Sequence, residues 1–275
     1  MALPHLSHSH DNCGMTPWQK RIRRAEELAE KHAFAAEILS FYVSIAGFQE
    51  NLHNKLNKTQ QTSGEIGDAL DGAALSKLAS QFESFLSLAE TRGPKKLAQV
   101  SRELHGRGPD FWTELLRSCW ANKTPSDAKD FLAVAFLQPY AEFLRSRSSL
   151  HLDHYKYALC PFCNRKAGLG VLRQMGDGGA RSLVCSFCLA EWDFRRIVCP
   201  GCGQENEKVL PVYASSDFDY IRIDACDSCK TYIKTVDMTK NGLAEPIVDE
   251  IAALPLDLWA QEQGYRKAQL NLLGL

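Results

Sequence analysis

Apolar residues recur at helical spacing through the first half of the chain. Residues 18–56 place them three and four positions apart among arginine, lysine and glutamate, which predicts one long helix or two abutting helices. Thr16 can cap the start of this segment, and Pro17 suits a first helical turn. A polar stretch over residues 57–64 then interrupts the pattern.

Further helices are predicted before residue 150, each with leucine and aromatic residues that we assign to the core. They cover residues 70–92, ending at Gly93-Pro94, then 95–104, 110–120 and the stretch after Thr124-Pro125. Ser126 or Asp127 can cap the last helix, and we expect Pro139 to kink or end it before Tyr140.

The pattern changes after residue 150. Residues 145–149 read Arg-Ser-Arg-Ser-Ser and predict a linker, and from residue 157 to about 238 short β-type runs alternate with turns. A helical segment follows, with Pro246 near its first turn, Pro255 dividing it and Gly264 after its end.

We therefore predict an α+β protein: an all-α N-terminal domain, two tandem zinc-ribbon β modules and a C-terminal helical tail. The segments are a flexible tail at 1–15, a helical domain at 16–150, metal ribbons at 157–198 and 199–240, and a helical segment at 244–275. The N-terminal tail carries His5, His8, His10 and Cys13, which could bind a metal, but a mobile polar terminus is the more common interpretation.

Charge excludes some classes of partner. The 275 residues include 32 Lys+Arg and 33 Asp+Glu, and neither half is a basic arm or an acidic tail. This balance argues against a nucleic-acid partner. The longest uncharged apolar stretches, residues 38–49 and 131–141, are shorter than the roughly 18 residues of a membrane span, and no secretory signal is visible. We expect a cytoplasmic protein without membrane insertion, and the sequence carries no prediction of oligomeric state.

Cysteine placement provides the candidate chemistry. Eight of the ten cysteines form four Cys-x-x-Cys pairs: Cys160 and Cys163, Cys185 and Cys188, Cys199 and Cys202, Cys226 and Cys229. In a reducing compartment such pairs indicate metal ligands rather than disulfides.

The four pairs form a duplicated pattern. Within each unit, 21 or 23 residues separate the two pairs, and the units repeat 39 to 41 residues apart. Each unit predicts a three-stranded ribbon, with strands at 169–175, 181–184 and 191–198 in the first and 208–213, 220–224 and 231–237 in the second.

Each Cys-x-x-Cys can form a tight knuckle that directs both sulfurs to one point. Two facing knuckles supply the four thiolates that zinc or iron accepts, which predicts two metal ions. The residue after a knuckle often needs a positive φ, which Asn164 and Gly203 can adopt. Four thiolates close the coordination sphere, so we expect structural or redox-responsive sites and no catalytic residues.

Other candidate features are weaker. A thioredoxin-type redox role is disfavoured because the four pairs lack a βαβ context. Cys119 lies beside Trp120 on an apolar helix and is more consistent with packing than with a nucleophile. Arg195-Arg196 lies on the predicted strand joining the ribbons and could bind an acidic partner, although a solvated strand face is the more common interpretation.

The order of these motifs resembles the formate dehydrogenase accessory protein family, FdhE. The resemblance lies in the four cysteine pairs, Glu191-Trp192, Tyr232, the segments 249–254 and 262–265, and weaker matches in the helical half. Asn164 and Lys166 stand where the family tends to have Gly and Pro.

The resemblance implies a cytoplasmic maturation factor, not an enzyme, that binds the catalytic subunit of respiratory formate dehydrogenase. It also implies rubredoxin-like ribbons, which make iron as plausible as zinc. A rubredoxin-like electron carrier is the main alternative, and a nucleic-acid-binding zinc ribbon is a weaker one, because the region after residue 150 carries 14 basic and 16 acidic residues.

Overall fold

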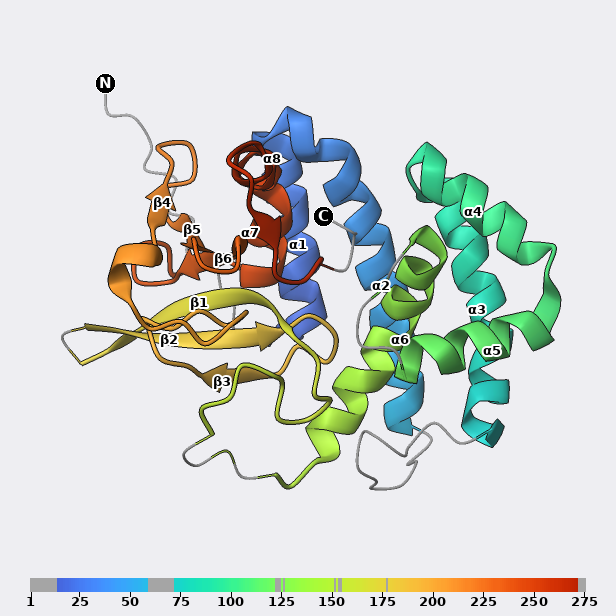
Figure 1. Cartoon of the computed structure of the whole chain (residues 1–275). Coiled ribbons are helices and arrows are strands. Elements are labelled where there is room, and N and C mark those ends of the chain that lie inside the picture. Colours follow the sequence, from blue (N-terminus) through green and yellow to red (C-terminus); the bar gives the residue numbers. More distant parts are fainter. Residues whose placement is uncertain are drawn as a thin grey trace.

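The computed structural model describes residues 14–58, 72–121, 125, 127–150, 152, 155–176 and 178–271. A helical half and a β-sheet half lie side by side, and the N-terminal and C-terminal helices α1, α7 and α8 lie at the sheet (Figure 1). Most of the N-terminal tail, including its three histidines and Cys13, lies outside the described residues.

The helical half contains helices from each predicted stretch. They are α1 (Pro17–Lys31), α2 (Ala36–Lys58), α3 (Gly72–Arg92), α4 (Lys95–His105), α5 (Gly108–Ala121) and α6 (Ala128–Arg147). A short 3₁₀ turn, Ala33–Ala35, separates α1 from α2, so the predicted long segment forms two abutting helices. Thr16 caps α1 in a capping box with Gln19, as its sequence position suggested.

Helix α6 differs from its prediction because it continues through Pro139 to Arg147. Proline cannot donate to the carbonyl oxygen of Ala135, four residues earlier. The side chain of Gln49 in α2 donates to that oxygen instead, with Nε2 at 2.6 Å. The lost backbone hydrogen bond is thus replaced from a neighbouring helix, and the predicted linker shrinks because residues 145–147 are helical.

The described strands form one seven-stranded sheet. They are β1 (Ala167–Met175), β2 (Gly178–Cys185), β3 (Glu191–Asp193), β4 (Val212–Ala214), β5 (Ile221–Cys226), β6 (Thr231–Asp237) and β7 (Arg266–Lys267). The order is β3-β2-β1-β6-β5-β4, with β7 on β6. Each predicted ribbon is therefore present as three antiparallel strands, and β1 and β6 pair in parallel to join the two.

Gly170 permits this close parallel pairing. It lies opposite Thr235 of β6, and a Cβ atom at Gly170 would approach the Thr235 hydroxyl oxygen to 2.4 Å. Any larger side chain would push the two ribbons apart. The close approach of β1 to β6 therefore depends on a glycine at this position.

Two predicted strand ranges are wrong. The strand predicted at 191–198 ends at Asp193, because the chain then leaves the edge and crosses toward the second ribbon. Carbonyl oxygens of this crossing segment accept hydrogen bonds from buried Arg181 rather than from a neighbouring strand. The strand predicted at 208–213 is Val212–Ala214, because Glu207–Val209 forms a 3₁₀ turn capped by Asn206.

Two C-terminal helices follow, α7 (Pro246–Ala252) and α8 (Leu254–Glu262), and α7 contacts both α1 of the helical half and strand β6 of the sheet. The carboxylate of buried Asp249 in α7 accepts hydrogen bonds from Arg24 in α1, with Nη2 at 2.6 Å, and from the hydroxyl of Tyr220 at 2.7 Å. A carboxylate with no exposed surface needs such partners, since an unpaired buried charge is strongly unfavourable.

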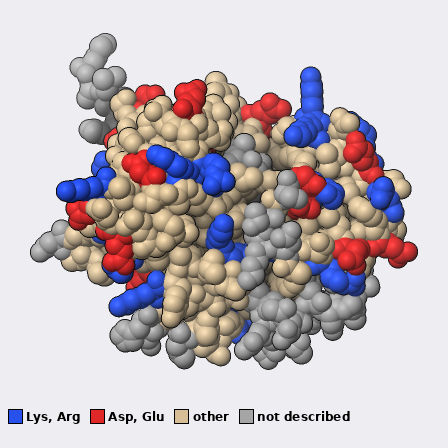
Figure 2. Space-filling model, in the orientation of Figure 1, with Lys and Arg blue, Asp and Glu red and all other residues tan. Residues whose placement is uncertain are grey.

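Acidic and basic side chains are interspersed over the face shown in Figure 2. None of the described helices combines the length and the hydropathy that a membrane span requires.

Candidate metal centres

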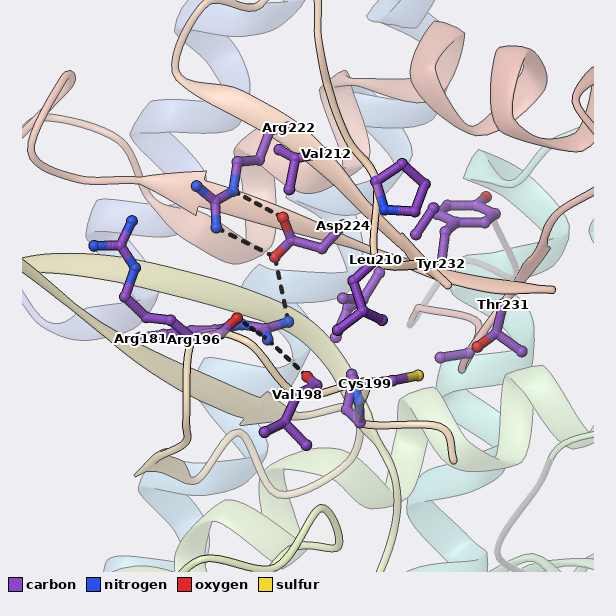
Figure 3. A pocket seen from close by; sticks show the side chains of 15 residues that line it. Arg181, Arg196, Val198, Cys199, Leu210, Val212, Arg222, Asp224, Thr231 and Tyr232 are labelled. Atoms are coloured by element: carbon purple, nitrogen blue, oxygen red, sulfur yellow. Dashed lines mark hydrogen bonds and ion pairs between the residues drawn. The ribbon is translucent and has the colours of Figure 1, made fainter. Parts of the chain in front are cut away.

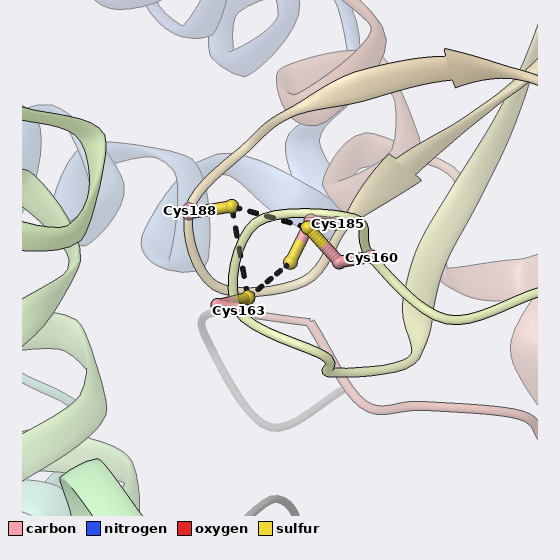
Figure 4. A group of neighbouring side chains, drawn as sticks. All are labelled: Cys160, Cys163, Cys185 and Cys188. Atoms are coloured by element: carbon pink, nitrogen blue, oxygen red, sulfur yellow. Dashed lines mark hydrogen bonds between the residues drawn. The ribbon is translucent and has the colours of Figure 1, made fainter. Parts of the chain in front are cut away.

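The first cysteine site joins the loop before β1 to the loop after β2. The sulfurs of Cys160, Cys163, Cys185 and Cys188 point toward one another (Figure 4). The Sγ atoms of Cys160 and Cys188 are 3.4 Å apart, as are those of Cys163 and Cys185, and Cys163 lies 3.7 Å from Cys188. Three of these cysteines are buried and Cys163 is half-buried.

The second site repeats this arrangement between the loop before β4 and the hairpin of β5 and β6. The Sγ atoms of Cys199 and Cys229 are 3.7 Å apart, and so are those of Cys202 and Cys226. Cys199 and Cys226 are buried, Cys229 is half-buried and Cys202 is exposed. The two sites therefore have the same donor atoms but different access to solvent.

The sulfur spacing fits a tetrahedral metal site. Zinc–sulfur bonds of about 2.3 Å in a tetrahedron place sulfurs about 3.8 Å apart. A disulfide would bring two sulfurs to about 2.05 Å, and all eight of these cysteines are free thiols. Each set of four sulfurs could hold one metal ion, which would fill its coordination sphere with thiolates.

Local backbone geometry forms the four knuckles. The residue directly after each Cys-x-x-Cys has a positive φ: Asn164 at 55°, Leu189 at 53°, Gly203 at 76° and Lys230 at 54°. The two predicted positions, Asn164 and Gly203, thus adopt this conformation. Leu189 and Lys230 were not predicted, because neither side-chain type favours a left-handed backbone; their place after a knuckle was the available signal.

Backbone N–H groups point at the sulfurs. The amide of Phe187 donates to Sγ of Cys185 at 3.4 Å, and the amide of Gly201 donates to Sγ of Cys199 at 3.3 Å. In the second site the hydroxyl of Thr231 also lies 3.0 Å from Sγ of Cys229. Donors of this kind stabilise thiolates, the form in which cysteine binds a metal.

The thiols influence one another strongly. Hydrogen bonds from its three partners, Cys160 first, hold the pKa of Cys163 far below its usual range. Burial raises the pKa of Cys185 well above that range, and hydrogen bonding within the cluster does the same for Cys188. The thiolate of Cys163 therefore forms readily while the thiols of Cys185 and Cys188 resist ionisation, and a bound cation would supply the charge that lets these two ionise as well.

The first site is embedded in the helical half. The ring of Phe187 lies 5.4 Å from that of Trp120 in α5, and the Arg165 guanidinium lies over Phe187 at 3.9 Å. Arg165 also donates to the carbonyl oxygens of Cys119 and Trp120, and Arg145 in α6 donates to the carbonyl oxygen of Cys188 at 3.1 Å. The sequence did not reveal these contacts, because they join segments distant along the chain.

The remaining described cysteine, Cys119, stays outside both sites. It is buried on α5, and its Sγ donates to Asp130 at 3.6 Å. Burial, followed by the Asp130 charge, raises its pKa to about 12. The thiol is thus held protonated, as expected for a packing residue rather than a nucleophile.

A helical half followed by one sheet with two four-cysteine sites defines a class of two-site cysteine-ribbon proteins. Family models described as the FdhE central domain and the FdhE C-terminal domain match residues 159–196 and 197–273. With these matches and the relatives below, the chain belongs to the FdhE family.

Relatives and a solved structure agree with this assignment. The chain is 28% identical to a protein FdhE homolog of Aquifex aeolicus over 265 residues, which cover 92% of this chain and 94% of that protein. It is 30% identical to an FdhE homolog of Pseudomonas putida, covering 67% of this chain and 60% of that one. The crystal structure of the FdhE protein from Pseudomonas aeruginosa has the same fold, with a TM-score of 0.68, 21% identity and coverage of 94% and 96%.

Proposed function

We propose that this protein is a non-catalytic accessory factor that binds the catalytic subunit of formate dehydrogenase in the cytoplasm and is required for its maturation. Membership of the FdhE family supports this proposal. The observation that carries it is the pair of complete four-sulfur sets, because a closed thiolate set suits a structural or redox-responsive site better than a substrate-binding one.

The eight clustered cysteines are the proposed ligands. Cys160, Cys163, Cys185 and Cys188 hold one ion, and Cys199, Cys202, Cys226 and Cys229 hold the other. Iron and zinc both accept a tetrahedral four-thiolate set, so the donor atoms are compatible with either. Metal analysis of anaerobically purified protein should give two ions per chain.

The sheet half is the proposed docking element. A pull-down with tagged full-length protein should retain the catalytic subunit. The double variant C160A/C163A should lose it, but this change also removes half of a site that is packed against α5 and α6. The double variant C199S/C202S is therefore the sharper test, since it alters the site nearer the surface.

The matched control is Ser228→Ala, which changes an exposed knuckle residue and leaves all four sulfurs in place. Retention by S228A and loss by C199S/C202S, with unchanged helical circular dichroism, support docking through the second ribbon. Failure of the unaltered protein to retain the catalytic subunit would overturn the proposed function.

The exposure of Cys202 favours one second candidate, a rubredoxin-like electron carrier. An electron-transfer centre needs one edge near the surface, and the second site has such an edge. This function requires a coloured iron centre that is reversibly reduced, so an absorption spectrum separates the two candidates. A colourless protein with two zinc ions removes the electron carrier.

A further inference from the structure

A small pocket lies between the two ribbons, beside the second cysteine site. Its walls include Cys199 and Pro200, the apolar side chains of Leu210 and Val212, and residues of β5 and β6 (Figure 3). The cavity volume is about 50 Å³. A single water needs about 10–15 Å³ by this measure, so the pocket has room for a few water-sized groups.

The charged residues of this pocket are unbalanced. Arg181, Arg196 and Arg222 line it, and Asp224 is the one acidic residue among its lining residues. We call this site the arginine pocket. Three guanidinium groups face one carboxylate, so N–H donors outnumber carboxylate acceptors in a partly enclosed space, where hydrogen bonds to an anion are stronger than in open solvent.

Asp224 already has several donors. Its Oδ1 lies 2.8 Å from Nε of Arg222, and its Oδ2 lies 3.2 Å from Nη2 of Arg181. The hydroxyl of Thr235 donates to the same Oδ2 at 2.8 Å. Asp224 therefore pairs with two of the three arginines, although its Oδ1 makes no hydrogen bond among the described residues.

Two of the arginines have N–H groups that are free to donate. Arg181 is 3% exposed, and its Nη1 donates to backbone carbonyl oxygens, including that of Val198 at 3.1 Å. Its buried Nε has no hydrogen-bond partner among the described residues. Arg196 donates to the carbonyl oxygen of Gly179 at 3.4 Å, and no described carboxylate lies within ion-pair distance of it. An unpaired N–H on a buried charged group is a cost that a bound acceptor would remove.

We propose that the arginine pocket binds a carboxylate, either a free short-chain one or the side chain of an acidic residue of the partner protein. A guanidinium fork matches the two oxygens of a carboxylate. The small cavity fits a short chain, and Leu210 and Val212 offer apolar contact to it. An acidic side chain of the partner as the occupant rests on the proposed function, whereas a free carboxylate does not.

The nearby Arg195 provides a matched control. It is exposed and forms an ion pair with Glu205, and it does not line the arginine pocket. Arg196 is exposed as well, so Arg196→Gln and Arg195→Gln each remove one surface guanidinium. Both variants are expected to fold.

The first arm titrates full-length protein with sodium acetate, and with sulfate and phosphate at matched ionic strength, by isothermal calorimetry. Acetate should bind, R196Q should weaken that binding about tenfold or more, and R195Q should change it less than about twofold. The variant R196K should recover only part of the affinity, because it restores the charge without the fork. Tighter binding of sulfate or phosphate than of acetate would overturn the carboxylate assignment.

The second arm measures retention of the formate dehydrogenase catalytic subunit. Loss in R196Q with retention in R195Q supports an acidic side chain as the occupant, even if free acetate does not bind. If neither arm responds to R196Q, the inference is overturned, whether or not the unaltered protein retains the subunit. Failure of the unaltered protein to retain the subunit counts against the proposed function, and the acetate titration then decides the pocket by itself.

Discussion

The two cysteine sites share a sulfur arrangement and differ in what surrounds them. In the second Cys-x-x-Cys pair of each site, the residue just before the last cysteine is Phe187 in the first site and Ser228 in the second. Phe187 is 1% exposed and contacts Trp120, whereas Ser228 is exposed. The equivalent position of the repeated unit therefore lies in the core in the first site and at the surface in the second.

The two ribbons are also held by different forces. The first site packs into the large apolar core that it shares with the helices. The second ribbon carries a buried charge cluster, in which Lys234 of β6 and Lys267 of β7 pair with Glu250 of α7 and Asp257 of α8. Burial acts to raise the pKa of Glu250, but the two lysine charges outweigh it and lower that pKa to about 2.

The largest difference is expected for loss of one cysteine sulfur from each site. Cys185→Ser should lower the thermal midpoint by about 10 °C or more, because Cys185 is buried and its loop forms part of the core. Cys202→Ser should lower it by about 5 °C or less, since that sulfur lies at the surface. Circular dichroism at a helical wavelength measures both. Equal midpoints for the two variants would contradict the distinction between core and surface.

The charge cluster gives the next largest effect. Lys234→Met leaves two buried carboxylates with one lysine and should cost about 3–5 kcal/mol of unfolding free energy. Urea titration measures this loss, with Lys208→Met, at an exposed position, as the control. An unchanged stability in K234M would show that charge pairing does not hold the second ribbon.

The knuckle residues provide a more moderate comparison. Phe187→Leu keeps an apolar side chain but loses the ring contact with Trp120 and the Arg165 stacking, so we expect a loss of about 1–2 kcal/mol. Ser228→Ala at the equivalent position should change stability by less than about 0.5 kcal/mol. Chemical denaturation of the two variants side by side tests the difference, and similar losses would argue against it.

The smallest expected effect is a difference in how readily a reagent reaches the thiols of the two sites. With limiting chelator and iodoacetamide, Cys202 should be alkylated before the cysteines of the first site, because a reagent reaches an exposed sulfur without local opening. Peptide mass spectrometry gives the order of modification. Earlier labelling of Cys185 than of Cys202 would reverse the assigned exposures.

Local patterns along the chain were sufficient to predict much of this protein. The helix cap at Thr16, the helix break at Gly93 and the grouping of the cysteines all depend on residues close in sequence or on a repeated motif. Pro139 shows the limit of such reasoning. Its helix continues because Gln49, 86 residues from Ala135, supplies the missing donor, and no local pattern contains that contact.

The same limit applies at the candidate sites. The sulfur sets follow from spacing, but the parallel pairing of β1 with β6 depends on the contact of Gly170 with Thr235, which joins two ribbons. The arginine pocket likewise combines Arg181 of the first ribbon with Arg222 and Asp224 of the second. The sequence identifies Arg196 as a basic residue, but the pocket that it lines forms only when the crossing segment folds against the second ribbon.

The ion pair between Arg24 and Asp249 has a consequence for synthesis on the ribosome. These residues are 225 positions apart, so Arg24 has no access to this partner until α7 has been synthesised. The contact between α1 and α7 therefore forms only after all the strands from β1 to β6, which lie between these helices in the chain, have been synthesised.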